Sequence, residues 1–324
     1  MKWPMLLLVL LVACDRGAPR TGMIYVSDEA SNVVHVIDAA TLEQRPPIAV
    51  GRRPRGLAMS PDRRLLYAAT SDDNRIAVVD LARNRVVGTL PCGPDPETIA
   101  LSPDGKRLYV ANEDDNLLSV VDVSARKVVR RIAVGGEPEG TAVSPDGRTV
   151  IQASETASMA HVVDAARGEV IDNLMVDTRP RYIAFTPDGK RFLVSSEIRG
   201  TVTAFDTTTH RRVGRIDFPA ALPGDRPPGE QIQAVGIALT RDGKRAFVAL
   251  GRAKLVAEID PRSLALIRTF PVGWRAWNLS LSSDERHLYT ANGLSGDVSV
   301  IDLTANRVVG RVAVGGKPWG IAVR

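Results

Sequence analysis

One pattern, about 42 residues long, recurs seven times in this chain and limits the folds it can adopt more than any other feature. The clearest copy begins at Ser102 and reads SPDGKRLYVANEDDNLLSVVDVSARKVVRRIAVGGEPEG. The aspartates that end the valine-rich run of each copy are separated by five intervals of 42 residues and one of 54, and lie at Asp38, Asp80, Asp122, Asp164, Asp206, Asp260 and Asp302. A fixed period in this range, with several strands in each repeat, indicates a β-propeller.

Each repeat is expected to form one blade of four antiparallel strands. The repeat that contains Asp122 has apolar runs at 98–101, 108–111, 117–121 and 128–134, with Pro/Gly or polar turns between them. Short runs of β-branched and aliphatic residues bounded by such turns predict strands, and no segment has an apolar 3.6-residue period of helix length. The predicted fold class is therefore all-β, a seven-bladed propeller of four-stranded antiparallel blades.

The two ends of the chain are predicted to complete one blade between them. Residues 23–26 match a second strand of the repeat, whereas the final residues, 319–324, match a first strand. Pairing these strands closes the ring and covers the edges that an open sheet exposes. We number the blades from the copy at Ser60, so the composite blade is blade 7. The long interval places about twelve extra residues around 218–231, before blade 5.

The first residues are typical of a bacterial export signal. Residues 1–14 contain a basic start, an apolar run too short to span a bilayer, and the ending Leu-Val-Ala-Cys14. This ending resembles a lipoprotein signal, in which cleavage precedes Cys14 and lipid is attached to its thiol, with 15–22 as a tether to a propeller over 23–324. We expect a periplasmic protein held by lipid at a bacterial membrane. The alternative is an ordinary secretory signal and a soluble periplasmic protein.

Composition and motifs argue against several functions. The chain has 42 basic and 37 acidic residues, and this net charge of +5 is too small to be a nucleic-acid signature. Only Cys14 and Cys92 are present, so a lipidated Cys14 leaves no intrachain disulfide. The motifs of c-type haem attachment, serine hydrolases, zinc proteases and phosphate loops do not occur, and His35 and His161 lie in blades that are not neighbours. We therefore assign no catalytic residue, metal ligand or cofactor.

The informative positions are the segments that lead into the first strand of each blade, at one mouth of the central funnel. There two residues flank a proline, or its equivalent position, and an extended chain would place both on the same side. The predicted binding residues at this mouth are Arg53, Arg55, Asp95, Glu97, Glu137, Glu139, Arg179, Arg181, Arg275, Trp277, Lys317 and Trp319. The loops after the second strands add Glu29, Glu113, Asp114, Asp115, Glu155 and Glu197 on the same face.

Two interpretations of this mouth are open. The acidic sector between two arginine pairs fits mutual neutralisation, in which exposed ion pairs contribute little. It also fits a recognition face for a partner or a small polar ligand, with Trp277 and Trp319 as anchors. Calcium binding by residues 113–115 has no support from the loop spacing.

The repeats resemble YVTN-type propeller proteins through LYVAN at 108–112 and LYTAN at 288–292. Strings found in single blades, such as ANEDDN at 111–116 and VSSEI at 194–198, resemble the seven-repeat propeller associated with PQQ-dependent catabolism. This resemblance implies a quinoprotein dehydrogenase or ABC-transport components as partners, with PQQ bound by a partner enzyme and not by this chain. That family has no established catalytic residues, so none is transferred.

The leading functional expectation is a non-enzymatic, exported binding or scaffold protein that acts with such a PQQ-dependent alcohol-oxidation system through the funnel mouth. A lactonase-type enzyme is one alternative, and it needs a metal or an acid–base group in the funnel, for which Glu97, Glu139 and Arg181 are the candidates. Single-stranded DNA binding is another, by fold analogy alone, and the acidic sector argues against it.

Overall fold

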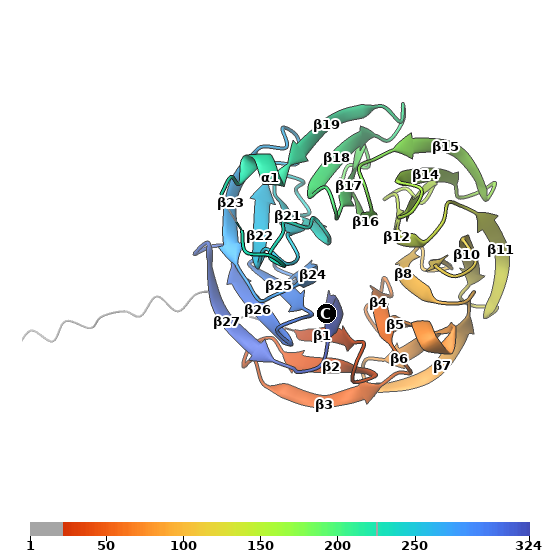
Figure 1. Cartoon of the computed structure of the whole chain (residues 1–324). Coiled ribbons are helices and arrows are strands. Elements are labelled where there is room, and N and C mark those ends of the chain that lie inside the picture. Colours follow the sequence, from red (N-terminus) through yellow and green to blue (C-terminus); the bar gives the residue numbers. More distant parts are fainter. Residues whose placement is uncertain (1–21, 225) are drawn as a thin grey trace, which may run out of the picture.

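Seven four-stranded antiparallel sheets stand around a common axis (Figure 1). The structure is a computed structural model that describes residues 22–224 and 226–324. The predicted signal segment 1–14 with its Cys14, and the tether as far as residue 21, lie outside the described residues. The predicted fold class, an all-β propeller with seven blades of four antiparallel strands, is confirmed.

The strands follow the sequence repeat blade by blade. Blade 1 holds β4 (Pro54–Met59), β5 (Leu65–Thr70), β6 (Arg75–Asp80) and β7 (Arg85–Pro91); blade 2 holds β8 (Pro96–Leu101), β9 (Arg107–Asn112), β10 (Leu117–Asp122) and β11 (Lys127–Ala133). Blade 3 holds β12 (Pro138–Val143), β13 (Thr149–Ser154), β14 (Met159–Asp164) and β15 (Glu169–Met175); blade 4 holds β16 (Pro180–Phe185), β17 (Arg191–Ser196), β18 (Thr201–Asp206) and β19 (Arg212–Asp217). Blade 5 holds β20 (Ile237–Leu239), β21 (Ala246–Ala249), β22 (Leu255–Ile259) and β23 (Leu266–Pro271); blade 6 holds β24 (Ala276–Leu281), β25 (His287–Asn292), β26 (Asp297–Asp302) and β27 (Arg307–Ala313). Blade 7 joins β28 (Pro318–Val323) to β1 (Met23–Asp28), β2 (Val33–Asp38) and β3 (Gln44–Ala49).

Within each blade the strands run from the axis to the outer rim. The first strands, such as β4, β8 and β12, lie nearest the axis, and the last strands, such as β7 and β11, form the rim (Figure 1). The second and third strands are almost fully buried because both of their faces pack against neighbouring blades, whereas the rim strands expose residues such as Val87 and Val129. First strands begin earlier than the apolar runs suggest, since pairing starts at the proline, as in Pro96 with Asn112.

The repeated aspartates hold the turns at the ends of the strands. The Oδ1 of Asp80 accepts the backbone N–H groups of Ala82 (2.9 Å) and Arg83 (3.0 Å), and Asp104 accepts from the Ser102 hydroxyl (2.7 Å) and the Lys106 N–H (3.0 Å). These hydrogen bonds favour the ionised form and lower the pKa of both carboxyl groups. The recurrent carboxylates outside the funnel are therefore turn formers, as the sequence indicates.

The ring is closed by strands from both termini, as predicted. β1 pairs with β28 through Ile24 opposite Val323 and Val26 opposite Ile321. The side chains of Ile24, Val26 and Ile321 join a buried cluster with Tyr289 of blade 6, so the seam is packed as well as hydrogen-bonded. This seam holds the seven first strands around one axis.

Helical structure is confined to short segments in the described part of the chain. The four-residue helix α1 (Phe218–Ala221) begins the long connection before blade 5, and the carboxylate of Asp217 accepts the N–H of Ala220 (3.2 Å) as its cap. Phe218 is fully buried in a cluster with Ile232 and Ala234, which ties this connection to blades 4 and 5. A 3₁₀ turn covers Ser71–Asp73. Neither segment, nor any other described residue, forms a helix long and apolar enough to cross a bilayer.

The closing seam makes a specific prediction for stability. Ile24→Ala removes a fully buried side chain, and we expect it to lower the free energy of unfolding by about 2–5 kcal/mol. Val309→Ala, on the outer rim and 36% exposed, is the matched control and should change it by less than about 0.5 kcal/mol. Urea unfolding followed by circular dichroism measures both; equal effects would contradict a packed seam.

Candidate functional site

The backbone that leads into the first strands sets the depth of the predicted site residues. The first of the two flanking residues has a positive φ in five blades, at Arg53 (49°), Asp95 (43°), Glu137 (52°), Arg179 (62°) and Arg275 (62°). This left-handed conformation is uncommon for residues with a Cβ atom, and it differs from the extended chain that the sequence suggests. The two flanking side chains therefore differ in depth: the exposed fraction of the side chain falls from 44% at Arg179 to 7% at Arg181.

Loop asparagines hold this backbone conformation in three blades. Each uses its side-chain Oδ1 to accept the N–H of the first flanking residue in the next blade: Asn32 from Arg53 (2.9 Å), Asn74 from Asp95 (3.0 Å) and Asn116 from Glu137 (3.2 Å). These asparagines are spaced by 42 residues. The recurring asparagine is therefore a sequence signal for the left-handed backbone before the first strand, and the apolar pattern of the repeat does not reveal it.

Backbone hydrogen bonds fix the positions of four loop glutamates near the axis. Each N–H donates to the carbonyl oxygen of a flanking residue: Glu29 to Lys317 (3.2 Å), Glu113 to Asp95 (3.0 Å), Glu155 to Glu137 (3.0 Å) and Glu197 to Arg179 (2.8 Å). The loops therefore place four additional carboxylates beside the charged residues at the starts of the first strands.

The result is a buried and half-buried cluster that we call the funnel network. It comprises Glu29, Arg53, Arg55, Asp95, Glu97, Glu113, Glu139, Glu155, Arg179, Arg181, Glu197 and Arg275. Eight of the twelve residues predicted at the mouth belong to it. Trp277 and Trp319 pack against it, whereas Glu137 and Lys317 lie outside it and form no ion pair with a described residue.

Arg53 and Arg55 form ion pairs with carboxylates of blades 2 and 7. Arg53, whose side chain is 31% exposed, lies 3.1 Å from the carboxylate of Asp95. Arg55 lies deeper and pairs with Glu97 and with Glu29, the latter at 2.7 Å. Glu97 is fully buried, so the charge of Arg55 is essential to its ionised form.

Arg181 is shared by three glutamates. Its guanidinium contacts Glu139, Glu155 (2.5 Å) and Glu197 (2.6 Å), and its side chain is 7% exposed. Arg275 adds a second cation to Glu197 at 2.7 Å. Glu197 therefore has two buried guanidinium groups beside it, from Arg181 and Arg275. Glu139 has only Arg181 at short range, and Glu155 has Arg181 and the more exposed Arg179.

The two tryptophans belong to the same packed layer. Their ring centroids are 6.1 Å apart. The guanidinium carbon of Arg275 lies 3.8 Å from the ring centroid of Trp277, and that of Arg55 lies 5.7 Å from the centroid of Trp319. Trp319 is only 5% exposed, so cation–π packing within the layer accounts for its contacts.

Charge is unevenly compensated across the funnel network. It holds seven carboxyl groups and five guanidinium groups. Burial and the charge of Glu139 raise the pKa of Glu97 well above its usual range, and the same causes raise that of Glu155 to about 8 against the opposing pull of the arginines. Burial also acts on Glu197, but Arg181 and Arg275 together bring its pKa down to about 2.

Glu139 has an oxygen that nothing in the described chain satisfies. Its Oε1 accepts from Arg181 and lies 3.9 Å from Arg55. Its Oε2 is buried and accepts no hydrogen bond from a described residue, and the side chain as a whole is 2% exposed. Leaving such an atom without a donor is costly, so Oε2 marks a place where water, a substrate or a cation can bind.

The funnel network closes the axis from one side. Below it the axis narrows to a cavity of about 50 Å³ lined by residues that include Thr98, Thr141 and Asn278. A larger hollow of about 590 Å³ lies on the opposite face and is lined by hairpin turns such as those of Asp188 and Asp242. These aspartates hold their own turns, so the funnel network, rather than the larger hollow, is the candidate functional site.

Two family profiles match separate parts of the sequence. A YNCE-like β-propeller profile matches residues 15–145, and a profile of the seven-bladed β-propeller lactonases matches residues 173–309. Both support membership of a β-propeller family, while the PQQ-associated family receives no specific support. No curated protein matches the sequence significantly.

Solved structures share the fold at low sequence identity. Hydrazine synthase of Kuenenia stuttgartiensis is 24% identical, with a TM-score of 0.76 over 88% of this chain and 93% of that chain. The periplasmic gluconolactonase of Pseudomonas aeruginosa is 20% identical, with a TM-score of 0.76 over 93% of this chain and 98% of that chain. A Bacteroides uniformis protein named as a candidate 6-phosphogluconolactonase is 17% identical, with a TM-score of 0.76 over 94% of this chain and all of that chain.

These matches correct the leading functional expectation. The non-enzymatic scaffold of a PQQ-dependent system was the wrong leading expectation, because the lactonase profile over residues 173–309 favours the lactonase-type alternative. The sequence also suggested a charged recognition face at the rim, whereas Glu97, Glu139 and Arg181 are buried.

Removal of the shared cation should be strongly destabilising. Arg181→Met leaves the buried Glu139 with only Arg55 at 3.9 Å and removes one cation from Glu197, so we expect the free energy of unfolding to fall by about 3–5 kcal/mol. Arg199→Met is the control, because Arg199 is 58% exposed and pairs with Asp217 at the surface; it should cost less than about 0.5 kcal/mol. Urea unfolding near neutral pH measures both, and a small effect of Arg181→Met would contradict the shared pairing.

The raised pKa of Glu155 predicts a pH-dependent stability. In the folded protein the Glu155 carboxyl group keeps its proton up to a pKa of about 8, whereas its ordinary pKa is 4.5. The contribution of Glu155 to the free energy of unfolding is therefore complete below pH 4.5. It is lost as the pH rises through 8. Glu155→Gln should therefore flatten the fall in urea midpoint across this window, whereas Glu137→Gln should retain the wild-type slope. Parallel profiles for all three proteins would contradict the assignment.

Proposed function

We propose that the chain hydrolyses a lactone at the funnel network. The observation that carries the proposal is Glu139, a buried carboxylate with a free Oε2 that lies beside the guanidinium groups of Arg55 and Arg181. A carboxylate next to two cations supplies both a proton acceptor and charge stabilisation in one place. The lactonase profile and the gluconolactonase among the structural neighbours support the same reaction class.

In the proposed reaction Glu139 accepts a proton from a water molecule as the water oxygen bonds to the lactone carbonyl carbon. Arg55 and Arg181 stabilise the negative charge that develops on the carbonyl oxygen. The ring C–O bond then breaks, and the carboxyl group of Glu155, protonated near neutral pH, donates its proton to the departing ring oxygen. The product is a hydroxy acid, and the proton on Glu139 returns to Glu155 through water.

Access to this site requires movement at the rim. Glu139 is almost without solvent contact, whereas Arg53 and Arg179 above it are 31% and 44% exposed. Their ion pairs are partly solvated and therefore weak enough to open. A compact sugar lactone, the substrate class named for the Pseudomonas neighbour, is therefore the probe that we choose.

Glucono-δ-lactone hydrolysis in a pH-stat, corrected for the spontaneous rate, tests the proposal. Glu139→Gln removes the proton acceptor while keeping the side-chain shape, so we expect kcat/KM to fall by about 10²–10⁴-fold. Glu137→Gln, two residues away at the rim, should leave it unchanged. Circular dichroism and melting temperatures show whether both variants fold. A wild-type protein that does not accelerate hydrolysis, or a fully active and folded Glu139→Gln, would refute it.

We also infer the cellular setting that the sequence predicts. The Leu-Val-Ala-Cys14 ending supports export and lipid attachment at Cys14, hence a periplasmic, membrane-anchored protein or, alternatively, a soluble periplasmic one. The blade-specific strings that resemble the PQQ-associated family support a context near quinoprotein enzymes or ABC-transport components. The absence of a cofactor in this chain and of nucleic acid as a partner stay predictions as well.

A further inference from the structure

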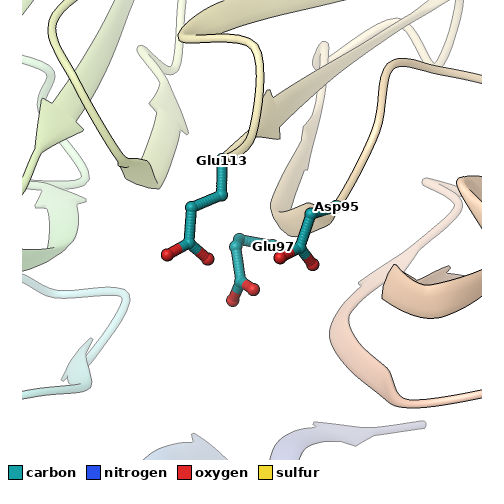
Figure 2. Close-up of side chains that lie close together, drawn as sticks. All are labelled: Asp95, Glu97 and Glu113. Carbon is teal, nitrogen blue, oxygen red and sulfur yellow. The ribbon is translucent and has the colours of Figure 1, made fainter.

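Three carboxyl groups of the acidic sector converge on one point. Asp95 and Glu97 flank Pro96 at the start of β8, and Glu113 follows β9 in the same blade. Each offers a carboxylate oxygen, and these three oxygens all lie within 4.8 Å of one another. Figure 2 shows the three side chains grouped together with their carboxyl groups close to one another.

Three converging carboxylate oxygens are ligands of the kind that calcium binds, at about 2.3–2.6 Å and in flexible geometry. Magnesium requires oxygens at about 2.0–2.1 Å in near-ideal octahedral geometry and gives up its bound waters reluctantly. An irregular group of three carboxyl groups therefore suits calcium better than magnesium.

A separate observation outside the three carboxyl groups also indicates a missing partner. The Oε2 of Glu139, in the next blade, is buried without a hydrogen bond from any described residue. Glu139 is linked to the cluster through Arg55, whose Nη1 contacts the carboxylate of Glu97 and lies 3.9 Å from the Oε1 of Glu139. A water molecule bound to a cation at the cluster would give this oxygen a donor.

The charges of the funnel network support the same conclusion. The network holds two more carboxyl groups than guanidinium groups, so a divalent cation at the cluster could replace protons as the counter-charge for that excess. Arg53 and Arg55 are the cations that compete for the cluster, and Arg53 is the more exposed of the two. Its contacts with Asp95 and Glu97 are 3.1 and 3.5 Å long and its side chain is partly exposed, so it is free to withdraw toward Asp72 at the rim.

We propose that Asp95, Glu97 and Glu113 bind one calcium ion beside Glu139. Its remaining ligands would be water, which leaves positions open to a lactone carbonyl oxygen. That last role rests on the proposed lactone hydrolysis: the ion would polarise the carbonyl, and Glu139 would accept a proton from a water bound to the ion. Binding itself does not depend on that reaction.

The test uses the full chain, stripped with EDTA and dialysed. Calcium should raise the melting temperature and bind with a stoichiometry of one in isothermal titration, in the range of about 10⁻⁴–10⁻³ M typical of extracellular calcium modules. Magnesium should bind at least about tenfold more weakly. Glu113→Gln should weaken calcium binding at least about tenfold, because Glu113 forms no ion pair with a described residue and its loss leaves the arginine pairs intact.

The matched control is Glu137→Gln, which removes one carboxylate from the same mouth outside the cluster and should leave calcium binding unchanged. No calcium binding by the wild type, or equal binding by Glu113→Gln and the wild type, would overturn the proposal. Calcium binding is measured without substrate, so its failure is separate from that of lactone hydrolysis. A protein that hydrolyses glucono-δ-lactone fully in EDTA would keep the reaction and exclude the ion from it.

Discussion

The pairing of β28 with β1 is the constraint on which the rest of the molecule depends. Because this seam closes the ring, the first strand of every blade lies near one axis (Figure 1). Residues that are 42 positions apart in sequence then become neighbours in space, as Arg53 and Asp95 are, or Arg181 and Glu139. A buried charge at the second flanking position of one blade therefore lies beside charges of a neighbouring blade, as Arg55 does with Glu97 and Arg181 with Glu139.

This crowding explains why the funnel network resembles a functional site more than a stabilising one. Buried ion pairs gain little net stability, because desolvation offsets most of their attraction. Arg181 compensates three glutamates, and burial together with the charge of Glu139 raises the pKa of Glu155 to about 8. An apolar layer, such as the isoleucines and valines lower on the first strands, would close the axis at lower cost.

The fold could be read from the sequence because it depends on periodic signals: the repeat length, the turn residues and the matching ends. The membership of the site was also largely visible, since eight of its residues are among those predicted at the mouth. Their depth was not, because it follows from the left-handed backbone at residues such as Asp95 and Glu137. In the sequence, this backbone conformation is indicated only by the asparagines that hold it, Asn32, Asn74 and Asn116.

The loop position after the second strand shows how a repeated scaffold acquires an asymmetric site. Its backbone N–H bonds to the lead-in carbonyl in blades with quite different side chains, from Ser71 and Gly293 to Glu113 and Glu155. The hydrogen bond does not depend on the side chain, so a glutamate can replace serine there without a change in backbone. Blades 2, 3, 4 and 7 all have glutamate at this position. The four loop glutamates, which create the excess of carboxyl groups and supply Glu113 to the acidic cluster, therefore occupy a position where the scaffold accepts different side chains at little structural cost.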